Sequence, residues 1–205
     1  YVPSFRGKVV AYPMQLPFVP VHAERLRGVA RFFARGVPAA ERRALPWVRI
    51  EQDYRFDSAD GEVALADLFA GRSQLVVYHF MLGPDWKNPC PSCSFWAEQF
   101  DGNAVHLRQR DTNLAVVSRA PLEKLEAFRR RMNWTFDWYS SAGGDFNYDF
   151  AVSFTPEEIG AGHRRYNFGT SGFGIEDAPG ISVFYRDVAG NIFNTYACFA
   201  RGLDM

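Results

Sequence analysis

A nearly continuous apolar run over residues 74–82 constrains the fold of this chain more than any other part of its sequence. The run lacks the polar–apolar alternation of a strand that has one face in water. It is typical of a strand buried on both faces of an α/β sheet. Further strands are predicted at residues 113–118 and 136–140, with helices from the cysteines to about residue 110 and from 121 to 132. Strands that alternate with helices in this way predict a sheet with a parallel centre.

Two hairpins and an N-terminal arm are predicted around this centre. Residues 47–65 predict a hairpin that turns at 57–61, and residues 181–199 predict a terminal hairpin that supplies an antiparallel edge. Residues 22–35 place Leu26, Val29, Ala30 and Phe33 on one face of a helix, and a short second helix ends before Pro46. We therefore divide the chain into an arm, 1–46, with one or two short helices, and a domain, 47–205.

The charge is balanced overall but divided between these two parts. Residues 1–50 carry nine Lys or Arg and two Asp or Glu, whereas residues 51–205 carry 14 and 21. We expect the basic arm to dock on the acidic body, either its own or that of a second copy in a homodimer. No basic motif suggests nucleic acid. No apolar run approaches the roughly 18 residues of a membrane helix, and no leader pattern is visible, so the cytoplasm is the default location.

The residues best suited to chemistry are Cys90 and Cys93, in the sequence Cys-Pro-Ser-Cys. They follow the buried strand by a short loop and open a helix. There, unpaired backbone N–H groups and the helix dipole stabilise a thiolate, which lowers the pKa of the first cysteine. Cys90 is therefore the predicted nucleophile, and Cys93, one turn later, can attack a mixed disulfide at Cys90. Pro91 suits the first helical turn because it lacks an N–H group.

Three other uses of a cysteine pair are weighed against redox chemistry. A structural zinc site usually takes a second pair or spaced histidines, and only Cys198 and four scattered His are at hand. Covalent haem requires His after the second cysteine, where this chain has Ser94. Two inert buried thiols are the third alternative, but the proline-rich loop before Cys90 is typical of an exposed, stiff segment. We expect no metal and no cofactor.

Several stretches resemble a bacterial thioredoxin-like family that is often described as predicted dithiol-disulfide oxidoreductases. They are LPWVRIEQDYRF, LADLFAGRSQLVVYHFMLGPDW, CPSCSFWAEQFDG, VVSRAPLEKLEAFRRRMNW, SSAGGDFNYDF, PGISVFYRD and FARGLDM, and the resemblance runs from about residue 40 to the end. It implies a thioredoxin-like α/β fold of the peroxiredoxin-like variant, with a central mixed sheet and an N-terminal hairpin. The chain departs from the family pattern at Pro89 and Asn194.

A proline just before the late strand of thioredoxin-like folds is usually cis and faces the cysteine pair. Pro179 occupies that position here, so we predict a cis bond that turns the backbone of Ala178 and Gly180 toward the cysteines, where an extended substrate could pair with it. Trp86, Pro91 and Pro179 are the predicted substrate-binding residues. His79 and Arg119 are further candidates for tuning the thiolate, with a buried core histidine and a surface salt bridge as the alternatives. Residues 145–150 either pack in the core or line a substrate groove. His106 is expected on the surface of its helix, and Cys198 is expected to be a small buried apolar residue.

Three functions are compatible with these features. The first is a dithiol–disulfide oxidoreductase that acts on disulfides of proteins or small molecules. The second is a thiol peroxidase, which would form a sulfenic acid. Peroxidases of the related fold usually place Thr or Ser three residues before the reactive cysteine, whereas Lys87 stands three before Cys90, and Cys90 three before Cys93. The third is a binding or assembly protein without activity.

Overall fold

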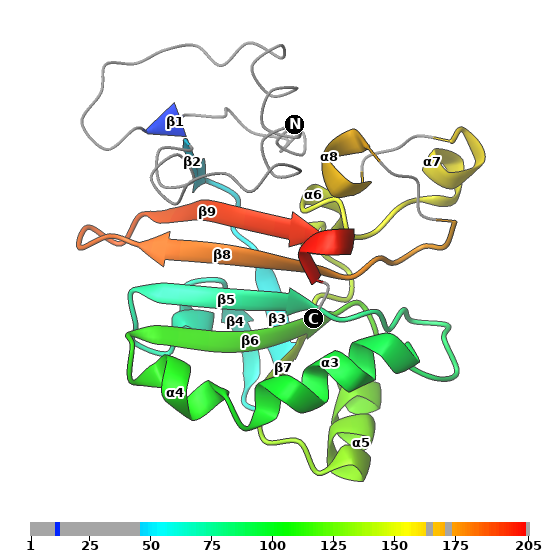
Figure 1. The fold of residues 1–205 in the computed structure, drawn as a ribbon, viewed down its shortest axis with the longest axis horizontal. Helices are drawn as coiled ribbons and strands as arrows, with labels where there is room; N and C mark the ends of the chain where they lie inside the picture. Colours follow the sequence, from blue (N-terminus) through cyan, green and yellow to red (C-terminus); the bar gives the residue numbers. More distant parts are fainter. Residues whose placement is uncertain (1–10, 13–45, 163–165, 171–173, 204–205) are drawn as a thin grey trace.

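The computed structural model describes residues 11–12, 46–162, 166–170 and 174–203. In this part of the chain the strands form one mixed sheet of nine, in the order β1-β2-β9-β8-β5-β6-β7-β3-β4 (Figure 1). They are β1 (Ala11–Tyr12), β2 (Trp47–Ile50), β3 (Arg55–Ser58), β4 (Gly61–Ala64), β5 (Gln74–His79), β6 (Thr112–Ser118), β7 (Asp137–Ser140), β8 (Gly180–Arg186) and β9 (Ile192–Phe199).

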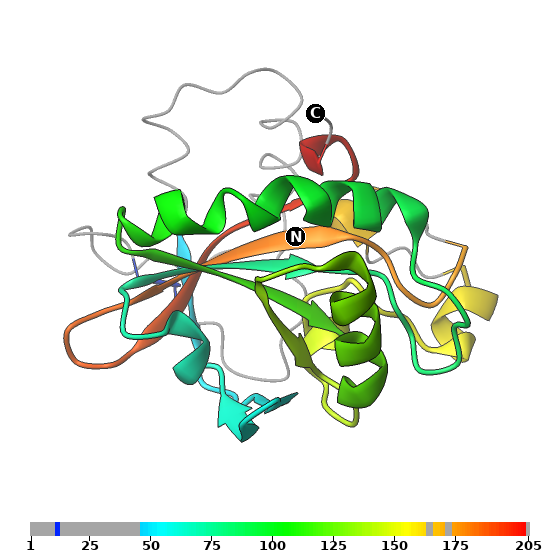
Figure 2. The same cartoon turned by 90° about the horizontal axis from the view of Figure 1, so that it is seen from below.

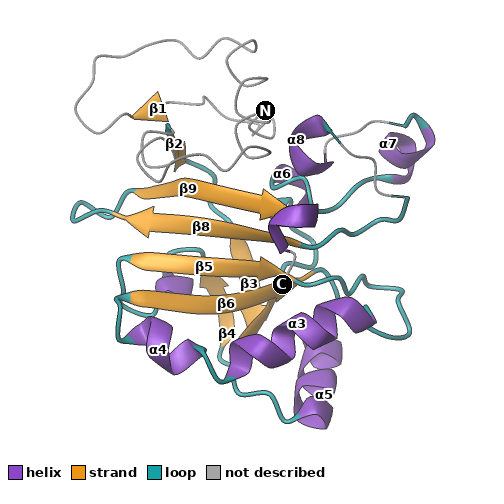
Figure 3. Ribbon diagram, viewed as in Figure 1, coloured by secondary structure: helices purple, strands orange, loops and turns teal. Residues whose placement is uncertain are grey.

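The helices are short and cover both faces of the sheet (Figure 3). Those described are η1 (Asp67–Phe69), α3 (Pro91–Asp101), α4 (Ala104–Arg108), α5 (Leu122–Met132), α6 (Phe146–Asp149), α7 (Pro156–Gly160), α8 (Tyr166–Gly169) and η2 (Ala200–Leu203). No helix among the described residues is long and apolar enough to cross a membrane. The predicted helix at 22–35 and the rest of the arm, apart from 11–12, lie outside the described residues.

The predicted parallel centre is confirmed. β5 pairs in parallel with β6, and β6 with β7, while α3, α4 and α5 make the crossovers between them. The helix expected from the cysteines to residue 110 is two helices, which break at Gly102 and Asn103 and run end to end along one face of the sheet (Figure 2).

The two predicted hairpins are correct only in part. β3 and β4 form a hairpin that joins the sheet beside β7, but β2 leaves it and pairs with β9 near the other end of the sheet. The β8–β9 hairpin exists, yet it is not an edge, because β5 flanks β8 and β2 flanks β9. Local sequence could not show this, since β2 and β9 are more than 140 residues apart.

Alternation along β5 separates two aromatic cores. Leu75 and Val77 point to a core beneath η1 and α6, with Phe56, Phe146 and Phe150. Tyr78 points to the opposite face, where α3 and α5 cover a second core that includes Cys93, Phe128 and Trp138. This period-two exchange of faces is ordinary strand geometry. It places both cysteines of the pair on one side of the sheet.

Gly180, the first residue of β8, lies where two neighbours approach closely. A β-carbon built there would meet Val152 Cγ1 at 2.8 Å and Phe199 Cδ1 at 3.2 Å. We expect Gly180→Ala to lower the free energy of unfolding by about 1–3 kcal/mol, because a well-packed core must shift to admit a methyl group. The midpoint of urea unfolding measures it.

Gly102→Ala is the matched control. Gly102 has a φ of −70°, and nothing lies within 4 Å of its built β-carbon. Its unfolding midpoint should be unchanged or slightly raised. Equal midpoints for the two variants would contradict the close packing of β8 against Val152 and Phe199.

Candidate active site

The cysteine pair lies at the carboxyl end of the central strand. The loop after β5 leaves at Met81 and returns at Cys90, whose N–H donates to the Met81 carbonyl over 3.3 Å. Ala120 N–H donates to the Leu82 carbonyl over 2.9 Å, which ties the loop to the end of β6. These bonds fix the start of α3 beside the ends of two parallel strands, where α/β sheets generally place their sites.

Cys90 is the N-cap of α3. The Cys90 backbone is extended (φ −62°, ψ 125°), and Pro91 takes the first helical position. The Cys90 sulfur accepts a hydrogen bond from the Cys93 N–H over 3.5 Å. The sulfur is thus placed among the unpaired donors of the first turn. Hydrogen bonds from the Cys93 thiol, and from the Cys93 and Ser92 N–H groups and the Ser92 hydroxyl, outweigh burial and lower the pKa of Cys90 to about 6.

Cys93 differs from Cys90 in both exposure and acidity. It is 1% exposed, whereas Cys90 is half-buried. The hydrogen bond that its thiol gives to Cys90, together with burial, raises the pKa of Cys93 well above its ordinary value. At neutral pH the arrangement is therefore a thiolate at Cys90 and a thiol at Cys93.

Tyr78 is the residue at this site that sequence reasoning missed. Its buried hydroxyl hydrogen-bonds to Cys93, and this bond acts to lower the pKa of the Cys93 thiol against the larger opposing effects. Burial raises the pKa of Tyr78 itself, so the phenol keeps its proton. Trp96 and Phe100 pack on its ring with centroids 6.4 and 5.1 Å away. The sequence signal that could have found Tyr78 is the alternation of side chains along the apolar run, because it sets which residues of β5 face α3.

The predicted cis bond at Pro179 is wrong. No peptide bond among the described residues is cis, and the backbone around Pro179 is already paired. Ala178 N–H donates to Val152 over 2.8 Å, and Gly180 sits between His79 of β5 and Phe199 of β9. An extended substrate would find no free strand edge there, so the predicted pairing of a substrate with the backbone of Ala178 and Gly180 is also wrong.

The other predicted substrate-binding residues lie near the thiols. Trp86 is half-buried and packs with Cys90 against the core on the α3 side. Pro91 is exposed in the first turn of α3. Pro179 is half-buried, and its carbonyl accepts the Tyr166 hydroxyl over 2.8 Å. Trp86, Pro91 and Pro179 as substrate contacts stay predictions.

His79 belongs to the structural core and not to the thiol site. It is buried on the face of β5 opposite Tyr78, and its ring stacks near Phe146 and Phe150. Nε2 lies 2.9 Å from the Ser182 hydroxyl, while Nδ1 has no hydrogen-bond partner among the described residues. Burial lowers the pKa of His79 to about 3, so the imidazole is neutral. It therefore carries no charge that could tune the thiolate.

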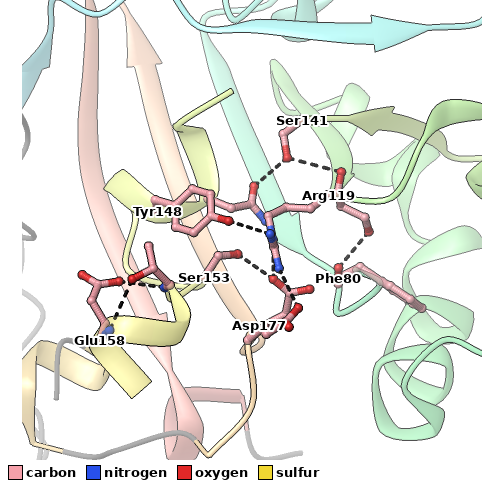
Figure 4. Close-up of polar contacts among 11 residues, drawn as sticks. Phe80, Arg119, Ser141, Tyr148, Ser153, Glu158 and Asp177 are labelled. Carbon is pink, nitrogen blue, oxygen red and sulfur yellow. Dashed lines mark hydrogen bonds and ion pairs between the residues drawn. The ribbon is translucent and has the colours of Figure 1, made fainter. Parts of the chain in front are cut away.

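Arg119 follows β6, and its guanidinium is held by its own polar partners (Figure 4). Its Nε donates to Asp177 Oδ1 over 2.7 Å, and Nη1 donates to the Tyr148 hydroxyl over 2.6 Å. Ser153 also donates to Asp177, which is 3% exposed. A β-carbon at Gly83 would lie 3.0 Å from Asp177 Oδ2 and 2.9 Å from the Trp86 ring. This polar cluster of Arg119, Tyr148, Ser153 and Asp177 therefore packs against Gly83, at the start of the loop that carries Trp86.

The remaining candidates have structural positions. Phe146 and Phe150 are buried, which confirms packing for the 145–150 segment, and Asp149 accepts the Tyr54 hydroxyl over 2.8 Å. His106 is exposed on α4, and Cys198 is buried on β9. Among the described residues, no group of three or more His, Cys, Asp or Glu could hold a metal ion.

Comparison with known proteins fits this geometry. Residues 34–205 match the family described as "Bacterial protein of unknown function (DUF899)". The chain belongs to this family. The match begins inside the predicted arm, and the division of the chain at residue 46 stays a prediction. A search of curated proteins finds no match.

Solved structures show the fold. A cysteine-to-serine mutant of PrxQ from Xylella fastidiosa has a TM-score of 0.50 and 15% identity, covering 71% of this chain and 77% of that one. Peroxidoxin BcpB from Mycobacterium tuberculosis has a TM-score of 0.50 and 14% identity, with 73% and 82% covered. The predicted thioredoxin-like fold of the peroxiredoxin-like variety is thereby confirmed.

The lowered pKa of Cys90 has a direct readout. We expect its alkylation rate to rise with pH around a midpoint near 6, instead of the roughly 8.5 of an unperturbed thiol. Stopped-time labelling with iodoacetamide, followed by peptide mass analysis, measures the rate at each cysteine. Cys93→Ala should raise the midpoint, because the largest stabilising hydrogen bond is lost. Preferential labelling of Cys93 would reverse the roles of the two thiols.

Proposed function

We propose that this chain is a dithiol–disulfide oxidoreductase, with Cys90 as the nucleophile and Cys93 as the resolving thiol. The observation that carries the proposal is the Cys90 sulfur as the N-cap of α3, accepting the Cys93 N–H. It combines a stabilised, half-buried thiolate with a buried second thiol one helical turn away. Low-pKa thiolates beside a resolving cysteine are the working parts of disulfide exchange.

The reaction balances without a cofactor. The Cys90 thiolate attacks one sulfur of a substrate disulfide, and the other sulfur leaves as a thiolate. Cys93 then loses its proton and attacks the Cys90 sulfur of the mixed disulfide, which releases the second substrate thiolate. The protein ends as a Cys90–Cys93 disulfide, oxidised by two electrons, and the substrate ends as two thiols after its two thiolates take up the Cys93 proton and one proton from solvent. The same steps reversed would oxidise a substrate dithiol.

Tyr78 supports the second step. Cys93 is buried, so its thiolate is costly to form, and the Tyr78 hydroxyl supplies a hydrogen bond to the developing charge. Hydrogen bonds to charged groups contribute about 1.5–3 kcal/mol.

A thiol peroxidase is the second candidate, because two solved structures of similar fold are named PrxQ and Peroxidoxin. Against it, Lys87 stands three residues before Cys90, where Thr or Ser is usual in such enzymes. Arg119, the cation at the end of β6, is also committed to Asp177 and Glu176.

A redox titration tests the main proposal. The purified protein is equilibrated in mixtures of reduced and oxidised glutathione, free thiols are trapped, and each modified cysteine is located by mass. We expect one two-electron transition in which Cys90 and Cys93 lose their thiols together while Cys198 keeps its own. Cys198→Ser should leave the midpoint unchanged. If no Cys90–Cys93 disulfide forms under any condition, the proposal is wrong, and rapid peroxide consumption would favour the second candidate.

The Tyr78→Phe variant tests the second step alone. The mixed disulfide at Cys90 should form at the wild-type rate but resolve roughly tenfold or more slowly, because the Cys93 thiolate loses one hydrogen bond. Quenched reactions with a neutral disulfide, analysed by intact mass, follow the adduct.

Tyr54→Phe is the control, since it removes another largely buried hydroxyl that bonds to Asp149 and not to sulfur. It should leave both steps unchanged. A Tyr78→Phe variant that resolves its adduct at the wild-type rate would remove Tyr78 from the mechanism.

A further inference from the structure

A cavity of about 250 Å³ lies between the loop that leads to Cys90 and helix α5. Its wall on the loop side includes the residue directly before Cys90, so the cavity begins where the nucleophile's backbone begins. Its size suits a small molecule or one end of it, since drug-sized ligands fill roughly 300–1,000 Å³. This cavity is called the groove, and its lining includes Leu82, Lys87, Pro89, Lys124, Phe128 and Arg131.

The charge of this groove has one sign. Three cations, Lys87, Lys124 and Arg131, line it, and no Asp or Glu does. None of the three forms an ion pair with a carboxylate in the described part of the chain. On the neighbouring turn of α5, Glu126 is occupied by Arg129, at 2.9 Å.

Neutral partners position two of these cations. Lys124 Nζ donates to the Pro84 carbonyl over 3.0 Å, which bridges α5 to the loop. The Arg131 guanidinium carbon lies 4.5 Å from the centre of the Phe128 ring. Both partners orient a cation without neutralising it, so the groove keeps a positive potential that attracts anions.

The floor of the groove is apolar. Leu82 and Phe128 are buried in the core that also holds Cys93, and Pro89 is half-buried. An apolar floor with a few convergent charges is the usual composition of a small-molecule site. A ligand that matches it has a short carbon chain that ends in an anionic group.

We propose that this groove binds the carboxylate end of a small anionic disulfide and so delivers its sulfur–sulfur bond to Cys90. The inference rests on the proposed function and narrows its substrate class to carboxylate-bearing, low-molecular-weight disulfides. The bonds formed and broken are those of the exchange already described. The groove adds a higher local concentration of substrate, and its effect weakens as salt screens the charges.

Three symmetric disulfides of similar length test the charge preference. They are dithiodipropionate, a dianion; hydroxyethyl disulfide, which is neutral; and cystamine, a dication. Each second-order rate of Cys90 oxidation is divided by the rate of the same disulfide with a small free thiol, because the three leaving groups differ in intrinsic reactivity. At low ionic strength this normalised rate should be highest for the dianion, about tenfold above the neutral compound, and lowest for the dication. Raising the salt concentration should compress the three normalised rates toward one value.

A variant that combines Lys87→Gln, Lys124→Gln and Arg131→Gln removes the charge and keeps a hydrogen-bond donor at each position. It should lose the preference for the dianion, measured within the variant as the ratio of its normalised rates with the dianion and with the neutral disulfide. The matched control, Arg72→Gln with Arg110→Gln, removes two cations that do not line the groove and should keep the preference. A preference that survives in the triple variant, or equal normalised rates for the three disulfides in the wild type, would overturn the inference.

Alkylation separates this inference from the proposed function. Iodoacetate and iodoacetamide react with a thiolate by the same displacement and differ in charge, so their rate ratio at Cys90 reports on the groove without any disulfide chemistry. The ratio should favour iodoacetate in the wild type relative to a free thiol, and fall several-fold in the triple variant. If no disulfide reacts but the ratio behaves as expected, the proposed function fails and the anion groove stands. If the ratio is the same in both proteins, the groove fails.

Discussion

The bond from the Cys93 N–H to the Cys90 sulfur governs the rest of the site. A sulfur is an unusual N-cap, and it serves here because a thiolate offers the charge that a helix N-terminus favours. The cap holds the two cysteines one turn apart, with the first partly open to solvent and the second turned into the core. The lowered pKa of Cys90 follows from the same helical turn, because the hydrogen bonds that stabilise its thiolate, the Cys93 thiol's first, come from residues 92 and 93. The helix start, the proposed nucleophile and the proposed resolving thiol therefore belong to one local structure.

Strand β5 gives this structure its surroundings. Its alternating side chains send Tyr78 toward Cys93 and His79 toward the aromatic core on the opposite face. Two adjacent residues of similar hydrogen-bonding capacity therefore have unrelated roles. The Arg119–Asp177 pair adds a second constraint, because Asp177 lies against Gly83 at the start of the loop that precedes the cysteines. The loop is thus fixed at its start by a charged pair and at its end by the helix cap.

What could be predicted from the sequence was local. A buried strand, a proline-rich loop and two cysteines before an apolar helix are neighbours in the chain, and periodicity is enough to find them. The break at Gly102, the departure of β2 to pair with β9, and the order of β8 and β9 in the sheet depend on distant partners. Pro179 was misjudged for the same reason, since the pairing of Ala178 with Val152 decides its backbone. The role of Tyr78 does not follow from the apolar character of residues 74–82 alone, because it depends on which face of β5 the side chain takes.

The same hydrogen bonds link the redox chemistry to stability. Cys90 has a pKa of about 6 in the folded dithiol and roughly 8.5 in an unfolded chain. A lowered folded-state pKa contributes stability that is fully present above the unfolded value and is lost as the pH falls through about 6. The disulfide has no thiolate, so it receives none of this contribution. At neutral pH the fold therefore favours the dithiol over a Cys90–Cys93 disulfide, and in the proposed exchange this would make the pair a stronger oxidant than two ordinary thiols at the same spacing. Because Cys90 is half-buried, solvent moderates the effect, and the buried Cys93 thiol supplies the largest part of it. The pair is therefore tuned chiefly by its own second cysteine and not by a distant charge such as Arg119.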